Sequence, residues 1–153
     1  IGTLKDSSLI ARRLTPVGSR VVGSPAYFEE HGTPKHPRDL KNHECLRYAY
    51  FSTGTIWHFN RDGEEVSVKV DGRMTANNGH ALLEAARQGV GLVLLPDFFL
   101  PEALANNELV RVLGEWDCDT GAIWALYPHN RHLSAKVRLF VDYLVDQFET
   151  PPW

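Results

Sequence analysis

The chain has 153 residues, which is enough for one ordinary domain or for one domain and part of a second. Hydrophobic residues make up 43% and charged residues 23% of it, close to the globular average, which excludes a disordered tail, a collagen-like fibre and a coiled coil. Sixteen Lys and Arg against nineteen Asp and Glu give a net charge of -3, which disfavours binding to DNA phosphates. No apolar run reaches the roughly 18 residues that a membrane span needs.

The two cysteines and the first residues of the sequence exclude further classes of protein. Cys45 and Cys118 lie far apart and form no C-x-x-C motif, so the sequence indicates neither a disulfide scaffold nor a zinc ribbon. The sequence starts at Ile1 with no signal-peptide pattern, as if inside a domain. We therefore expect a part of a longer protein.

Short strands and one short helix are expected in the first half of the chain. Ser24 and Pro25 predict a helix start, because serine caps the first turn and proline at the first helical position loses no needed hydrogen bond. Asp62-Gly63 predicts a tight hairpin turn, since this pair accepts positive φ values. In chain order we expect strands at 9–14 and 20–23 separated by Thr15-Pro16-Val17-Gly18, a helix at 25–31 ending at Gly32, a loop at 33–43, and alternating strands at 45–50, 55–60 and 66–70.

The clearest helix-to-strand pattern covers residues 77–95. Asn77 or Asn78 can cap a helix, and the apolar stripe that follows consists of Leu82, Ala85, Ala86 and Gly89. The continuous apolar run 90–95 predicts a strand buried on both faces. A helix followed by such a strand is half of a βαβ unit.

The last helix is unusually apolar. Ser134 caps it, and one stripe consists of Val137, Val141, Leu144 and Phe148, while Leu139, Tyr143 and Val145 make the other side apolar too. A helix that is hydrophobic all round needs burial on more than one face, a second indication that part of the fold lies outside this chain. Between the two long helices we expect a short helix at 101–105 and strands at 109–113 and 122–127.

Few patterns indicate catalysis or metal binding. His129 and His132 lack a nearby third ligand, so solvated surface histidines are the favoured interpretation. Cys45 is a candidate nucleophile, although a thiol in an alternating strand is more often a small core residue. Gly89-Val90-Gly91 follows a helix and precedes a strand, the reverse of the order that phosphate-binding glycines need.

The stretch Asn77-Asn78-Gly79-His80 gives the strongest indication of a ligand site. First-turn N–H groups of a helix lack intrahelical partners and carry partial positive charge, and no acidic residue lies in this turn. Gly79 would let a ligand approach the backbone, and His80 could add a donor. A site for a small anion or carboxylate and a merely capped helix are the two interpretations.

Four stretches cover nearly the whole chain in a fixed order. They are IGTLKDSSLIARRL, RVVGSPAYFEEHGTPKHPRDLKNHECLRY, VDGRMTANNGHALLEAARQGVGLVLLPDFF and WALYPHNRHLSAKVRLFVDYLVDQF. Together they resemble the C-terminal effector-binding domain of LysR-type transcriptional regulators. The resemblance implies an α/β fold like that of periplasmic binding proteins, in which crossover strands join two Rossmann-like subdomains around a ligand cleft.

The resemblance also implies a domain organisation. Residues 1–17 would be a remnant of subdomain I with a crossover strand, 18–128 a complete effector-binding subdomain II, and 129–153 a C-terminal helix that returns to subdomain I. Subdomain I would be incomplete, and the family's N-terminal winged helix-turn-helix would be absent from this chain. We therefore do not expect the chain alone to bind DNA specifically.

Carried over residue by residue, the resemblance places effector contacts at Thr3, Ser24, Asn77, Asn78, Gly79 and His80. Tyr48, Tyr50 and Trp57 either wall the pocket or pack in the core. No catalytic residue, metal or cofactor is expected, only a small-molecule effector such as a carboxylate or another anion.

In the family, the effector changes how dimers or tetramers hold promoter DNA. The expected partners are thus a small metabolite, a homodimer or homotetramer, and DNA through the missing helix-turn-helix, in the cytoplasm and without a membrane. Candidate self-association surfaces are the C-terminal helix and residues 81–88, with Leu83 and Arg87 off the core stripe. The alternatives are a solute-binding protein of a transport system and an enzyme of the same fold, although no plausible catalytic pair is present.

Overall fold

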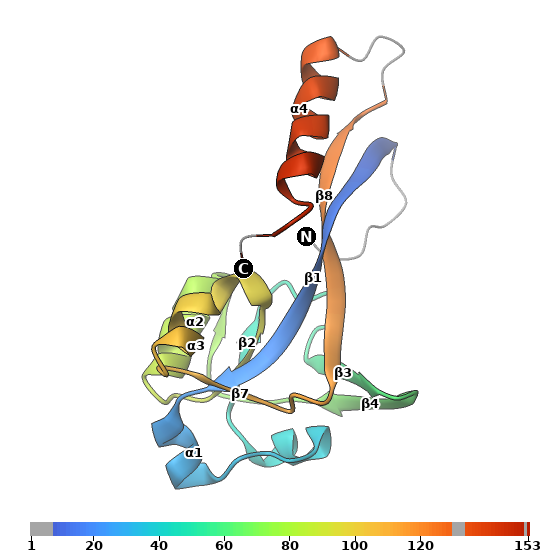
Figure 1. The fold of residues 1–153 in the computed structure, drawn as a ribbon. Coiled ribbons are helices and arrows are strands. Elements are labelled where there is room, and N and C mark those ends of the chain that lie inside the picture. Colours follow the sequence, from blue (N-terminus) through green and yellow to red (C-terminus); the bar gives the residue numbers. More distant parts are fainter. Residues whose placement is uncertain (1–7, 130–133, 152) are drawn as a thin grey trace. The chain divides into compact units, whose positions relative to one another are not determined.

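The computed structural model describes residues 8–129, 134–151 and 153 (Figure 1). The chain divides into two compact units, one of residues 1–17 and 120–153 and the other of residues 18–119. Two strands, β1 (Leu9–Gly23) and β8 (Asp117–Pro128), have residues in both units. No helix in the described part of the chain is long and apolar enough to cross a membrane.

The described elements mix strands and helices, as the α/β class predicted. After β1 come α1 (Pro25–His31), the 3-10 helix η1 (Pro37–Asn42), β2 (Cys45–Tyr48), β3 (Ile56–Arg61), β4 (Glu64–Lys69), β5 (Thr75–Ala76), α2 (Gly79–Arg87), β6 (Leu92–Pro96), η2 (Asp97–Phe99), α3 (Pro101–Ala105), β7 (Val110–Val112), β8 and α4 (Ala135–Gln147). The described strands are hydrogen-bonded in the order β4-β3-β8-β1-β6-β2-β5, and β7 pairs with β1.

Strand β6 lies between β1 and β2 in the second unit. It runs parallel to β2 and antiparallel to β1. Its residues 92–95 are all buried, and their alternation places Leu92 and Leu94 in one apolar cluster and Val93 and Leu95 in another. The predicted strand with two buried faces is therefore confirmed for residues 92–95, whereas Val90, expected to begin it, lies before the strand and is 37% exposed.

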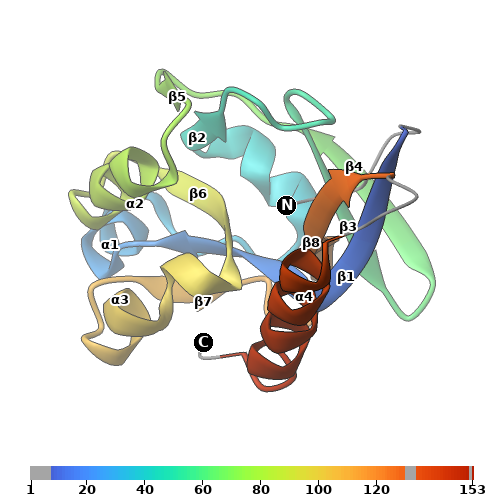
Figure 2. The same cartoon turned by 90° about the horizontal axis from the view of Figure 1, so that it is seen from above.

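Each face of this sheet has its own apolar layer. On one face, α2 and α3 supply Leu82, Leu83, Ala86 and Ala103 to the cluster that contains Val93 and Leu95 (Figure 2). The cluster on the other face joins η1 and the β3–β4 hairpin through Leu40, Trp57, Phe59, Val68 and Trp116. The expected tight turn of that hairpin is present, since Asp62 and Gly63 have φ values of 51° and 87°.

Two expectations for the first third of the chain were wrong. Strand β1 is continuous and Thr15-Pro16-Val17-Gly18 does not interrupt it, because Thr15 and Val17 point into buried space while Pro16 is exposed. A proline can occupy a strand position whose missing N–H has no ladder partner. The expected loop at 33–43 contains η1, whose first turn is capped by the His36 ring and by the Asp39 carboxylate.

Helix α4 begins after Ser134, as predicted, and its Ser134 hydroxyl accepts a hydrogen bond from the Lys136 amide. Val141 is the buried residue of α4, whereas Leu139, Phe140 and Tyr143 are exposed by more than half. Within the first unit, the described residues thus leave most of this apolar helix uncovered.

Truncation of one leucine in each helix should distinguish the buried face of α2 from the exposed surface of α4. Leu82→Ala should lower the free energy of unfolding by about 2–5 kcal/mol, because Leu82 is 0% exposed in α2. Leu139→Ala, the same change at a side chain 69% exposed on α4, should stay within about 0.5 kcal/mol. Urea denaturation followed by tryptophan fluorescence measures both changes. Equal losses would contradict the assignment of the core.

Candidate effector site

The carboxyl ends of three parallel strands meet at one edge of the second unit. Tyr48 and Ala76, the last residues of β2 and β5, are paired, and β6 runs parallel to β2 and ends at Pro96. The predicted stretch 77–80 follows β5, and η2 follows β6. Ligands of open α/β sheets bind outside the carboxyl ends of the strands, so this edge is the candidate site.

Asn78, and not Asn77, caps α2. Its side-chain oxygen accepts hydrogen bonds from the amides of His80 at 2.9 Å and Ala81 at 3.3 Å. The first turn of α2 contains no acidic residue, so its partial positive charge is not compensated there. Because Asn78 satisfies two first-turn amides, an anion would bind the Gly79 amide or displace the Asn78 side chain.

Gly79 is needed for a different reason from the one expected. A Cβ built on Gly79 would lie 2.5 Å from the Phe99 ring, so the space beside this glycine is occupied by an aromatic side chain. The same ring packs edge-to-face against His80, with ring centroids 4.9 Å apart. Phe99 thus fixes the start of α2 against η2, a role that sequence patterns did not indicate.

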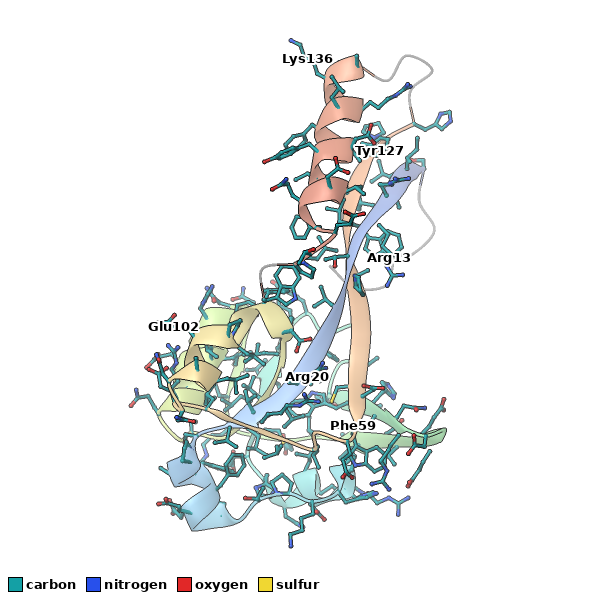
Figure 3. The ribbon with its side chains drawn as sticks, in the orientation of Figure 1. Arg13, Arg20, Phe59, Glu102, Tyr127 and Lys136 are labelled. Carbon is teal, nitrogen blue, oxygen red and sulfur yellow. The ribbon has the colours of Figure 1, made fainter. Side chains whose placement is uncertain are left out.

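A charged pair at the same edge was also missed. The Arg20 Nε lies 3.4 Å from the Asp97 Oδ1, and both side chains are about one-quarter exposed (25% and 27%). Arg20 on β1 (labelled in Figure 3) also donates to the Ser19 carbonyl at 2.9 Å. The β1–β6 register places Ser19 opposite Pro96, which brings this pair to the carboxyl end of β6.

Ser24 does not lie with Asn78. The buried Ser24 hydroxyl caps α1 by accepting a hydrogen bond from the Tyr27 amide at 3.3 Å. It lies 3.4 Å from the position that a Cβ of Gly89 would take, just beyond the last residue of α2. A nine-residue helix is about 13 Å long, so Ser24 and Asn78 are at opposite ends of α2. Thr3, the remaining predicted contact, lies outside the described residues.

The three aromatic residues considered for the pocket wall differ in their surroundings. Trp57 is 3% exposed and belongs to the core, which decides between its two interpretations. Tyr48 lies at the candidate edge, where it packs on the apolar cluster beneath α2, and Tyr50 contacts its ring edge-to-face. Tyr50 is itself largely exposed.

Cys45 has the surroundings of a core residue. Its thiol is fully buried and donates to the Leu40 carbonyl at 3.6 Å. Burial raises the pKa of Cys45 to about 12, with smaller contributions from Glu44 and Asp71, so the thiolate needed for nucleophilic attack is not formed near neutral pH. Among the described residues, no group of three or more His, Cys, Asp or Glu side chains could hold a metal ion. His132 lies outside those residues.

Because Asn78 caps α2 and Asn77 does not, alanine substitutions at these two positions should differ in their effect on the free energy of unfolding. Asn78→Ala should lower the free energy of unfolding by about 0.5–2 kcal/mol, because two first-turn amides lose their acceptor. Asn77→Ala is the matched control and should stay within about 0.5 kcal/mol, because Asn77 is exposed and outside the cap. Chemical denaturation compares them, and a larger loss for Asn77→Ala would overturn the assignment.

Comparison with known proteins places this geometry in a family. The model of the LysR substrate binding domain matches residues 1–149. The chain is 36% identical over 139 residues to the probable HTH-type transcriptional regulator LtrA of Klebsiella pneumoniae, covering 89% of this chain and 45% of that protein. The chain spans about half the length of the curated relatives it matches, for example 45% of LtrA and 49% of the transcriptional regulator PtxR of Pseudomonas aeruginosa.

Two solved structures are similar over almost the whole chain. The full-length Vibrio cholerae virulence activator AphB is 34% identical with a TM-score of 0.82, covering 94% of this chain and 49% of that one. The CrgA regulatory domain of Neisseria meningitidis is 32% identical with a TM-score of 0.81, covering 96% and 72%. The chain therefore belongs to the LysR substrate-binding domain family and has the fold of the regulatory domain of LysR-type transcriptional regulators.

Proposed function

We propose that this chain is the effector-sensing part of a bacterial LysR-type transcription regulator. The observation that carries the proposal is the family match over residues 1–149, together with relatives that are transcriptional regulators. A small metabolite would act by binding one state of the regulator more tightly than another, and only this difference in affinity can change promoter binding. Nothing in these similarities favours a solute-binding protein of a transport system.

We propose that the effector binds at the start of α2 and is a small carboxylate or another anion. The partial positive charge at the N-terminus of α2, which no acidic residue of the first turn compensates, favours an anion by about 0.3–2 kcal/mol. In this proposal the exposed His80 side chain donates a further hydrogen bond to the ligand. Asp97 at the same edge would oppose an anion, but its charge is paired with Arg20.

The remaining partners are also proposals. We propose a homodimer or homotetramer that contacts DNA through a winged helix-turn-helix outside this chain, works in the cytoplasm, and needs neither a cofactor nor a catalytic residue. One expected self-association surface, residues 81–88, needs correction, because the Leu83 side chain of α2 is buried in the core and Arg87 pairs with Glu108 at 2.9 Å. The other expected surface, α4, has exposed apolar side chains that either the rest of subdomain I or a second copy of the regulator would cover.

A change of charge at Asn78 tests the effector site without loss of the cap. Asn78→Asp keeps a good N-cap residue but adds a fixed negative charge, and Asn78→Ser keeps a cap without charge. A panel of small mono- and dicarboxylates, screened by thermal shift, first identifies a binding carboxylate. Its affinity, measured by calorimetry, should fall about tenfold or more in Asn78→Asp, a difference of about 1.4 kcal/mol, and stay within about threefold in Asn78→Ser.

Two outcomes would count against this site. Equal binding by the wild type and Asn78→Asp would contradict the location at the start of α2. Thermal stabilisation by uncharged molecules alone would contradict the anionic class of ligand. Neither outcome would alter the membership of the family, which rests on the match over residues 1–149.

The proposal that effector binding and DNA binding reside in different domains of the regulator gives a second test. Residues 1–153 alone should not retard promoter DNA in a gel shift, because their net charge of -3 provides little attraction for phosphates. The full-length regulator should bind the same DNA specifically. Specific nanomolar retardation by residues 1–153 would show that DNA contacts reside in this chain.

A further inference from the structure

In the second unit, Tyr27 connects α1 to the segment before β2. This contact lies at the end of the unit where α2 has its C-terminus. Its ring is 2% exposed, and its hydroxyl accepts a hydrogen bond from the Glu44 amide at 3.0 Å. The same hydroxyl lies 3.2 Å from the His43 Nδ1. One phenol thus joins α1 to the segment that leads into β2.

The two hydrogen bonds at this phenol define the favoured form of His43. The Glu44 amide can only donate, so it takes a lone pair of the phenol oxygen. Burial raises the pKa of Tyr27, which keeps its proton in place, and this proton is then directed at the His43 Nδ1. An Nδ1 that accepts belongs to a neutral imidazole, because both nitrogens of a charged imidazole are donors.

The surrounding groups disfavour a charge on His43. Burial and the nearby His31 lower the pKa of His43 below its usual 6.5, and Asp39 of η1 acts weakly in the opposite direction. His31 stacks on the Tyr27 ring, with centroids 4.4 Å apart and planes at 9°. Protonation of His43 would therefore place a second donor against the phenol, beside another basic side chain.

Glu44 and Asp71, two acidic groups near this contact, are each paired with an arginine. Glu44 pairs with Arg73 at 3.4 Å and also accepts a hydrogen bond from the Arg73 amide at 3.1 Å. A pocket of about 600 Å³ lies beside His43, and Lys41 and Asp71 are among the residues that line it. His43 lines this pocket and its side chain is half-buried, so the imidazole is accessible to solvent.

We propose that the Tyr27–His43 contact is a protonation-sensitive latch that holds α1 in place at neutral pH and releases it in acid. The folded state prefers neutral His43, whereas the unfolded chain has the ordinary pKa of 6.5. The latch therefore stabilises the folded state fully above about pH 6.5, and this stabilisation is lost as the pH falls through the lower folded-state pKa. The inference is independent of the effector proposed above.

The test measures the opening of α1 in the whole chain at one pH above and one pH below the ordinary histidine pKa. Hydrogen exchange of the α1 amides, corrected for intrinsic rates, is compared at about pH 7.5 and about pH 5.5, around the ordinary histidine pKa. The wild type should lose protection in acid by up to about tenfold, because pH 5.5 lies about one unit below the ordinary histidine pKa that His43 regains when α1 opens. In His43→Gln, whose amide does not titrate, the loss should be under about twofold.

Two controls keep the outcome decisive. His31→Gln removes the other histidine against Tyr27 and should keep a reduced loss of protection in acid, because burial, the larger cause of the lowered pKa of His43, remains. The histidine ring signals of the unmodified chain report the titration of His43 directly by NMR, whether or not any variant folds. A His43 midpoint at or above 6.5, or an equal loss of protection in His43→Gln, would overturn the proposal.

Discussion

The burial of β6 on both faces is the constraint on which the second unit depends. Its alternating side chains enter two separate apolar clusters, so one strand anchors the layer of α2 and α3 on one face and η1 and the hairpin on the other. A strand without a solvent face needs strands on both sides to satisfy its backbone, and β1 and β2 provide them. This arrangement fixes where the parallel strands end and thus where polar groups gather.

The candidate effector site follows from the direction of these strands. Side chains that are distant in sequence meet at the carboxyl ends, where Asn78 caps α2, Phe99 closes against Gly79, and Asp97 pairs with Arg20. Most of the polar groups there already have partners in the protein. An effector would therefore have to exchange existing contacts for its own, and such an exchange is what makes binding depend on the state of the protein.

The amino ends of the same strands are organised differently. There the phenol of Tyr27 accepts a hydrogen bond from the Glu44 amide in place of a backbone carbonyl. In the proposed latch, the stability of the contact between this phenol and His43 depends on the protonation of His43. The proposed anion site is electrostatic and depends on the charge of its ligand, whereas the Tyr27–His43 contact depends on proton activity. The two edges of one sheet would thus respond to different chemical signals.

The sequence by itself determined the elements that depend on near neighbours. Periodicity predicted α2 and the buried strand after it, Asp62-Gly63 predicted the hairpin turn, Ser24 and Ser134 predicted two caps, and four ordered stretches indicated the family. Only the tertiary structure decided which asparagine caps α2, that Phe99 fills the space beside Gly79, and that Ser24 lies at the other end of the helix. The partners in the Arg20–Asp97 and Tyr27–His43 contacts are far apart in sequence, so no local pattern encodes them. Such contacts exist because a twice-buried strand brings its neighbours together, and local propensity carries no information about that packing.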